Sequence, residues 1–84
     1  MARKSVPRGG CPSPDCRMGH RRQRAINPGE LQEIPEADRS KIGRAETDVF
    51  VCGYCGCVYL RSNSRIIGWK DNAVFGKKWV PASQ

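Results

Sequence analysis

Hydrophobic residues are concentrated in the second half of the chain, where their pattern predicts short β-strands. β-Branched and aromatic residues fill short runs that are separated by Ser, Asn, Asp and Gly, as expected for strands joined by turns. Ser62-Asn63-Ser64 lies between two such runs and predicts a β-hairpin. The predicted strands are residues 47–51, 58–61, 65–69 and, after a turn at Asp71-Asn72, 73–75 and 77–80. We therefore expect this half of the chain to form antiparallel β-hairpins.

The first 46 residues are mostly polar, and nothing in them predicts a core of their own. Residues 1–9 are predicted to be a flexible basic arm. In the following segment, residues 11–16, two prolines impose a tight, non-helical path. Residues 21–26 can form a short strand, so only a small part of this half is expected to join a sheet.

Residues 27–46 are interpreted as an insertion within a domain that covers residues 10–84. Asn27-Pro28-Gly29 predicts a turn, because Pro fixes φ and Gly tolerates a positive φ. Residues 35–41 can form a short helix, with Pro in the first turn, acidic residues near its start and basic residues near its end, or equally a loop. Apolar anchors are few. We therefore expect the insertion to be a mobile surface loop that contacts a partner and does not support the fold.

The chain has 84 residues, which limits it to one small domain, near the size at which an apolar core alone gives little stability. A further cross-link is therefore expected, and the five cysteines are the candidates. No apolar stretch follows the basic N-terminus, and no run is long enough to cross a membrane. We expect a cytoplasmic protein without a membrane role, whose reduced thiols favour a metal over disulfides.

Two cysteine pairs have spacings typical of metal ligands. Cys52 and Cys55 are separated by two residues, so one tight turn can direct both sulfurs at one ion. Gly56 allows the positive φ that such a turn needs. Cys11 and Cys16 form a looser pair with four intervening residues. Because zinc accepts four thiolates tetrahedrally, we predict one Zn²⁺ per chain, held by Cys11, Cys16, Cys52 and Cys55.

Two other residues compete for a place in this ligand set. His20 follows Cys16 by four residues and can replace Cys11, although a solvated polar residue is the simpler interpretation. Cys57 follows Cys55 by two residues and reaches the same ion only if the turn deforms. Its backbone N–H is better placed to serve the Cys55 sulfur. The cysteines can also be small buried apolar residues or disulfide partners, but their pairing beside Gly and Pro favours a metal.

With the pairs placed in this way, the chain resembles the zinc ribbon superfamily. Cys11-Pro12, followed by Cys52-x-x-Cys55-Gly56-x-Val58, matches the order of the two zinc knuckles in those domains. The resemblance covers the knuckles and the hairpin after the second one. It implies a small β-rich, metal-stapled domain with antiparallel β-hairpins, here with a long loop or short helix between the knuckles. It also implies binding to nucleic acid or protein, and rarely catalysis.

Residues 51–59 also look like the first iron-binding turn of rubredoxins. In rubredoxins the Cys-Pro knuckle follows that turn, whereas here it precedes it. The order of the knuckles and the basic charge therefore argue against an electron carrier.

Charge is unevenly distributed along the chain, which has a formal net charge of +7. Residues 1–26 contain seven Arg or Lys and one Asp, and residues 49–84 contain five and one, whereas residues 27–48 contain six Asp or Glu and three Arg or Lys. Both basic segments carry cysteines, so a shared zinc would bring their arginines to one end of the domain. Arg pairs well with phosphate. The candidate nucleic-acid-binding residues are Arg17, Arg21, Arg22, Arg24, Arg61 and Arg65.

We therefore expect a binding module that contacts nucleic acid, either RNA or DNA, through this basic surface. The alternative is a protein–protein adaptor or a small zinc-stapled subunit of a larger assembly, because residues 66–81 contain both Trp residues and the insertion is acidic. An enzyme is not expected. The sequence has no Ser/His/Asp set, carboxylate pair or phosphate loop, and a four-thiolate site has no open position for water. No small-molecule substrate is indicated.

Overall fold

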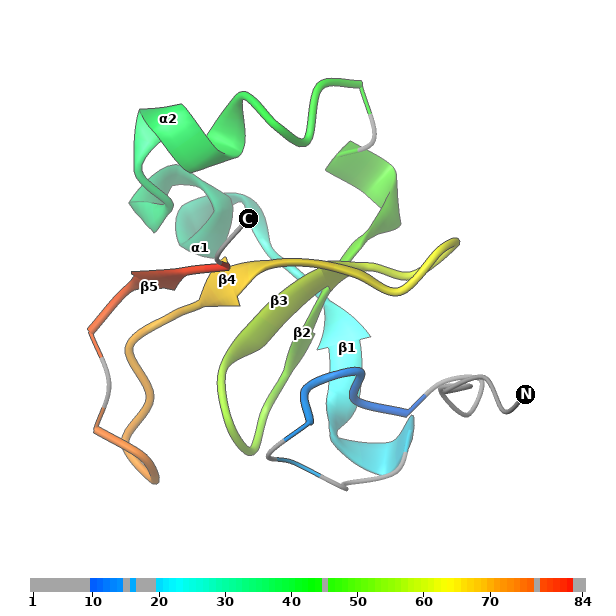
Figure 1. Cartoon of the computed structure of the whole chain (residues 1–84), viewed down its shortest axis with the longest axis vertical. Helices are drawn as coiled ribbons and strands as arrows, with labels where there is room; N and C mark the ends of the chain where they lie inside the picture. Colours follow the sequence, from blue (N-terminus) through cyan, green and yellow to red (C-terminus); the bar gives the residue numbers. More distant parts are fainter. Residues whose placement is uncertain (1–9, 15, 17–19, 45, 77, 83–84) are drawn as a thin grey trace.

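The computed structural model describes residues 10–14, 16, 20–44, 46–76 and 78–82. They form a five-stranded antiparallel sheet in which the strands follow the chain in order, from β1 to β5 (Figure 1). The strands are β1 (Gln23–Ala25), β2 (Val49–Cys52), β3 (Cys57–Leu60), β4 (Arg65–Trp69) and β5 (Val80–Pro81). Two short helices, α1 (Pro28–Glu33) and α2 (Glu36–Arg39), and two 3₁₀ turns, η1 (His20–Arg22) and η2 (Glu46–Asp48), complete the fold.

The predicted antiparallel β-structure is confirmed. The strands expected at residues 47–51, 58–61 and 65–69 correspond to β2, β3 and β4. The predicted strand at residues 73–75 is wrong. Asn72 makes a turn there, because its side-chain oxygen accepts the N–H groups of Val74 at 2.7 Å and Phe75 at 3.1 Å. A side chain that takes up the backbone N–H groups in this way withholds them from a ladder. Only Val80–Pro81 pair with β4.

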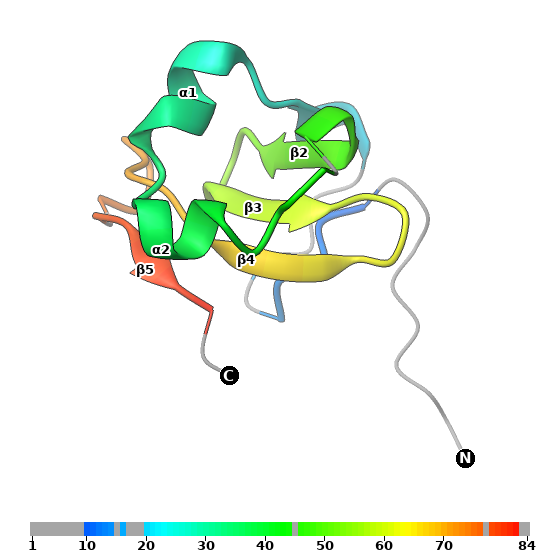
Figure 2. The ribbon, with the colours of Figure 1, turned by 90° about the horizontal axis from the view of Figure 1, so that it is seen from above.

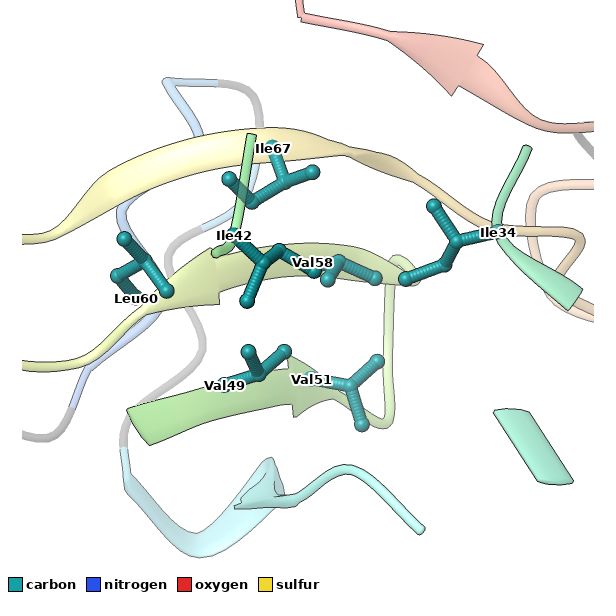
Figure 3. Packing of buried hydrophobic residues seen from close by; sticks show 7 residues of the cluster. All are labelled: Ile34, Ile42, Val49, Val51, Val58, Leu60 and Ile67. Carbon is teal, nitrogen blue, oxygen red and sulfur yellow. The ribbon is translucent and has the colours of Figure 1, made fainter. Parts of the chain in front are cut away.

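One face of the sheet carries the apolar core. Side chains alternate between the faces of a strand, so residues two apart share a face. Val49 and Val51 of β2, and Val58 and Leu60 of β3, follow this rule and pack on one face with Ile67 of β4 (Figure 3). Helices α1 and α2 lie together beside this face (Figure 2). The remaining two members of the core are Ile34, which follows α1, and Ile42, which lies beyond the end of α2.

The expectation that residues 27–46 form a mobile loop outside the core is therefore wrong. Ile34 is 2% exposed and Ile42 is 4% exposed, both within the apolar core. Asp38 accepts the indole N–H of Trp79 at 2.8 Å, which ties α2 to the C-terminal segment. The expected short helix is present as α2, but a second helix, α1, precedes it. The insertion thus closes over one face of the sheet.

Helix α1 begins at a motif that we interpreted as a turn. Asn27 is its N-cap and accepts the N–H of Glu30 at 2.9 Å, while the Glu30 carboxylate accepts the N–H of Asn27 at 3.3 Å. This reciprocal pair is a capping box, and Pro28 occupies the first turn, where a missing N–H costs nothing. The same residues therefore start a helix in place of a simple reversal.

A β-bulge in β4 distributes its side chains between the two faces. Val58 pairs with Gly68 and Tyr59 pairs with Ile66, so Ile67 is an extra residue in the ladder. The bulge turns Ile67 to the apolar core and leaves Ile66 and Trp69 beside the cysteines on the other face. Gly68 is required because the ring of Trp79 covers it. An added Cβ would collide with this ring and lie 2.8 Å from its Cη2 atom.

Candidate metal centre

The structure brings together four cysteines from distant parts of the chain. Cys52 ends β2 and Cys55 lies in the β2–β3 turn, while Cys11 and Cys16 belong to the N-terminal loop on the same side of the sheet. All four are buried, and their Sγ atoms lie within 4.8 Å of one another. This is the group of residues that the sequence predicts. It could hold one metal ion.

Two of the sulfur separations match the edge of a tetrahedral site. Sγ of Cys11 lies 3.6 Å from Sγ of Cys55, and Sγ of Cys16 lies 3.9 Å from Sγ of Cys52. A tetrahedron with metal–sulfur bonds of about 2.3 Å has edges of about 3.8 Å. A disulfide needs about 2.05 Å, and all four residues are free thiols. The spacing therefore suits an ion at the centre better than a covalent bond between any two sulfurs.

The second knuckle, residues 52–56, is shaped by its backbone. Gly56 N–H donates to the Cys52 carbonyl at 2.9 Å, which closes the turn, and Tyr54 N–H donates to Sγ of Cys52 at 3.4 Å. Gly56 has φ +83°, so the predicted positive φ is confirmed. A Cβ there would also lie 2.7 Å from the carbonyl oxygen of Lys70. Glycine is needed at this position for both conformation and space.

The first knuckle is held by contacts of Ser13 within the loop and with the sheet. Cys16 N–H donates to the Ser13 carbonyl at 3.1 Å. The Ser13 side chain is buried, and its Oγ accepts the indole N–H of Trp69 at 3.3 Å. Trp69 therefore joins β4 to the loop that carries Cys11 and Cys16. Its ring lies against the cysteine cluster and outside the apolar core.

Hydrogen bonds to sulfur prepare Cys52 for the thiolate form. Burial opposes ionisation, yet its pKa is lowered, because the backbone N–H groups of Cys55 and Tyr54 and the Gln23 side chain donate to the sulfur. Gln23 lies opposite Cys52 in the β1–β2 ladder and also accepts the Tyr59 hydroxyl at 2.9 Å. Burial raises the pKa of Tyr59, which keeps this hydroxyl a donor.

The pKa of Cys55 is raised, because the adjacent Cys11 sulfur shares a proton with it and both are buried. Thiols packed so closely cannot all ionise without a cation between them. A divalent ion would replace the protons and supply the missing positive charge.

Cys57 lies beside the four sulfurs without belonging to their group. It is 0% exposed, its thiol hydrogen-bonds to that of Cys11, and its backbone N–H donates to the Cys55 sulfur, as the sequence predicts. His20 is the alternative ligand that the sequence offers. Its side chain lies outside the described part of the structure.

Four further residues surround the centre that the sequence pattern did not indicate: Gln23, Tyr59, Ser13 and Trp69. One signal was present, because Tyr59 follows Cys57 by two residues and so had to share its face of the strand. Gln23 could not be found in this way, since its place opposite Cys52 depends on the pairing of β1 with β2.

The candidate arginines that the structure describes do not all lie at one end of the domain, contrary to that expectation. Arg21 and Arg22 are exposed in η1, beside the second knuckle, and the Arg22 carbonyl accepts Gly53 N–H. Arg61 and Arg65 instead flank the β3–β4 hairpin loop, at the opposite end of β3 (Figure 1). Three residues of strand separate Cys57 from that end, about 10 Å. Arg17 lies outside the described residues.

Arg24 is engaged within the domain. Its guanidinium donates two hydrogen bonds of 2.7 Å to the Glu30 carboxylate. Lys70 also approaches Glu30, with Nζ 3.6 Å from its carboxylate. Glu30 therefore links β1, the N-terminus of α1 and the segment after β4. Arg24 is correspondingly less available to a phosphate than Arg21 or Arg22.

We expect Glu30→Gln to destabilise the domain by about 1 kcal/mol at neutral pH, because it breaks the paired hydrogen bonds to Arg24 and weakens the capping box. The Arg24 guanidinium is the main reason that the pKa of Glu30 is lowered to about 2. The stabilisation by the charged form is therefore present above about pH 4.5 and is lost as the pH falls toward 2.

Chemical denaturation of metal-loaded wild type and Glu30→Gln at neutral pH measures this difference, which should begin to shrink at about pH 4. The exposed neighbour Glu33 provides a matched control, and Glu33→Gln should leave the free energy of unfolding unchanged. Equal effects of the two substitutions would contradict the role assigned to Glu30.

Comparison with known proteins gives no relative: no family model, no curated protein and no solved structure matches this chain. None of the described helices has the length and apolar character needed to cross a bilayer.

Proposed function

We propose that this protein is a binding module of the zinc ribbon type, in which one zinc ion held by Cys11, Cys16, Cys52 and Cys55 stabilises the fold. The support is the sulfur spacing, the burial of all four thiols and the order of a Cys-Pro knuckle before a Cys-x-x-Cys-Gly knuckle. Four thiolates fill the tetrahedral shell, which leaves no position for a substrate or an activated water. The zinc is therefore structural, and the protein acts by binding.

We infer that the module binds nucleic acid through the η1 turn beside the second knuckle. The observation that carries this inference is the exposure of Arg21 and Arg22 in a turn that is hydrogen-bonded to the knuckle. Among the described residues, no carboxylate forms an ion pair with either of them, in contrast to Arg24. Unpaired guanidinium groups on a domain of net charge +7 attract phosphate.

The expected result is weak, sequence-tolerant binding that falls steeply with salt. For a single-stranded oligonucleotide, the log–log slope against salt is about −0.7 per phosphate contacted. The double substitution Arg21→Gln, Arg22→Gln should therefore make the slope shallower by about 1.4, because about two contacts are lost. Zinc content and melting temperature should stay unchanged. Fluorescence anisotropy titrations at several salt concentrations provide the measurement.

The matched control removes the same charge at the other end of β3. Arg61→Gln with Arg65→Gln should leave the slope close to that of the wild type. An equal loss from both double variants would show that net charge, and not the η1 turn, drives binding. Absence of binding at low salt would favour the adaptor function, for which the exposed apolar side chains of Val74 and Val80 are the supporting observation.

A further inference from the structure

An aromatic pair is exposed at the tip of the second knuckle. Tyr54 lies between the ligands Cys52 and Cys55, and its ring meets that of Phe75 edge to face, with centroids 5.3 Å apart and planes at 84°. Tyr54 is 37% exposed and Phe75 is 38% exposed. Neither ring belongs to the apolar core or to the packing around the cysteines. Neither of these two clusters therefore accounts for the two large apolar side chains at this position.

Both rings are held by ordered backbone. The knuckle fixes Tyr54, whose N–H donates to Sγ of Cys52, and a metal at the four sulfurs would stiffen this turn further. Phe75 is placed by the turn at Asn72, which accepts its N–H at 3.1 Å. A ring that is already positioned loses little conformational entropy when a ligand stacks on it. This end of the molecule is therefore suited to a flat ligand.

The basic η1 turn is hydrogen-bonded to the knuckle that carries Tyr54. Gly53, the neighbour of Tyr54, contacts the carbonyl of Arg22, and an added Cβ at Gly53 would lie 3.3 Å from that oxygen. The η1 turn, with the exposed Arg21 and Arg22, therefore adjoins the knuckle that carries Tyr54. A ring beside unpaired guanidinium groups offers a base and its phosphate separate binding partners.

We propose that Tyr54, supported by Phe75, stacks on an unpaired base of single-stranded nucleic acid whose phosphates contact Arg21 and Arg22. This inference rests on the proposed nucleic-acid binding and identifies the ligand more closely. A base inside a duplex is already stacked on its neighbours, so an isolated exposed ring reaches it only in a single strand. Stacking depends on the face that all bases share, which agrees with sequence-tolerant binding.

The size of the exposed aromatic surface also favours a base over a protein. A Phe or Tyr side chain can bury about 150–250 Å². At little more than a third exposed, the two rings together offer on the order of 150 Å². A stable protein–protein interface needs about 800 Å² from each partner. The pair is therefore sufficient for one or two bases and too small to be the main part of a protein interface.

The decisive experiment compares two single strands with the same phosphates. Metal-loaded protein is titrated at low salt with an oligothymidylate of about a dozen nucleotides and with an abasic strand of the same length. Stacking predicts that the strand with bases binds at least about tenfold more tightly. Tyr54→Leu should remove most of this preference without changing the salt slope. Tyr54→Phe, which keeps the ring, should preserve it, and Phe75→Leu should weaken it.

The outcomes separate this inference from the proposed function. Equal affinity of the wild type for the two strands overturns the stacking role, and it leaves the proposed function standing if binding still depends on Arg21 and Arg22. This comparison needs no variant, so it holds even if a substitution disturbs the knuckle. A preference that survives in Tyr54→Leu also overturns the role of this ring. Failure of both strands to bind overturns the stacking role and the proposed function together.

Discussion

Cys55→Ser will abolish the cooperative folding of this chain. A structural zinc ion contributes an apparent 10–16 kcal/mol or so at neutral pH, and a small domain has a total stability of roughly 5–15 kcal/mol. Losing one of four thiolates therefore removes more free energy than the domain can supply. The same result is expected for serine at Cys11, Cys16 or Cys52. Metal analysis of purified protein and thermal melts measure it, with one zinc per chain and a cooperative transition expected only in the wild type.

Cys57 provides the matched control, because it is buried on the same face and lies outside the group of four sulfurs. Cys57→Ser places a hydroxyl in a fully buried position and changes the hydrogen bond to Cys11, which should cost about 1–3 kcal/mol. One zinc per chain should remain. If Cys57→Ser lost its metal as Cys55→Ser does, or if the wild type contained almost no zinc, the ligand assignment would be wrong.

The parts of the fold that sequence analysis predicted correctly depend on local chemistry. The Cys-x-x-Cys-Gly turn needs a positive φ after the second cysteine, and Gly56 adopts it. Alternating β-branched residues in β2 and β3 need only the two-residue repeat of a strand to reach one face. Because such features involve residues near one another in sequence, the two cysteine pairs, the main strands and the hairpin could be found without a structure.

The place of the arginines was misjudged because it depends on pairing between distant segments, whereas the error at Asn72 is local. The sequence shows that Arg61 and Arg65 flank a hairpin loop, but only the antiparallel register shows that this loop is at the end of β3 opposite Cys57. An Asn at position 72 is equally expected between two strands and within a turn that replaces the second strand. Its hydrogen bonds to Val74 and Phe75 decide the outcome.

The middle segment was misjudged for a similar reason. Ile34 and Ile42 are separated by polar residues, and Pro35 directly after Ile34 argues against one continuous helix that contains both. Ile34 follows the end of α1, and Ile42 lies beyond the end of α2. Each isoleucine therefore packs against the sheet from a separate segment. The apolar core thus gains two members that helical periodicity does not reveal.

Replacing residues 27–46 with a short Gly/Ser linker will therefore unfold the domain, even when zinc is supplied. The deletion removes Ile34 and Ile42 from the apolar core, the capping box with its bonds to Arg24, and the Asp38 carboxylate that accepts the Trp79 indole N–H. The face formed by Val51 and Val58 would then meet water. Circular dichroism and thermal melts of the zinc-loaded variant measure the loss, which should appear as the absence of a cooperative transition.

A milder substitution tests the same point with the backbone intact. Ile34→Ala should lower the free energy of unfolding by about 2–5 kcal/mol, because it leaves a cavity between α1 and the sheet, while the chain still binds one zinc. Ala37→Ser, at an exposed position of α2, serves as the control and should cost less than about 0.5 kcal/mol. A linker variant that melted cooperatively near the wild-type temperature, together with a silent Ile34→Ala, would show that the sheet and its metal fold without this cover. Loss of stability in Ile34→Ala with retained zinc would instead show that two parts of the domain stabilise it independently. These parts are the four-thiolate centre on one face of the sheet and the helices with Ile34 and Ile42 on the other.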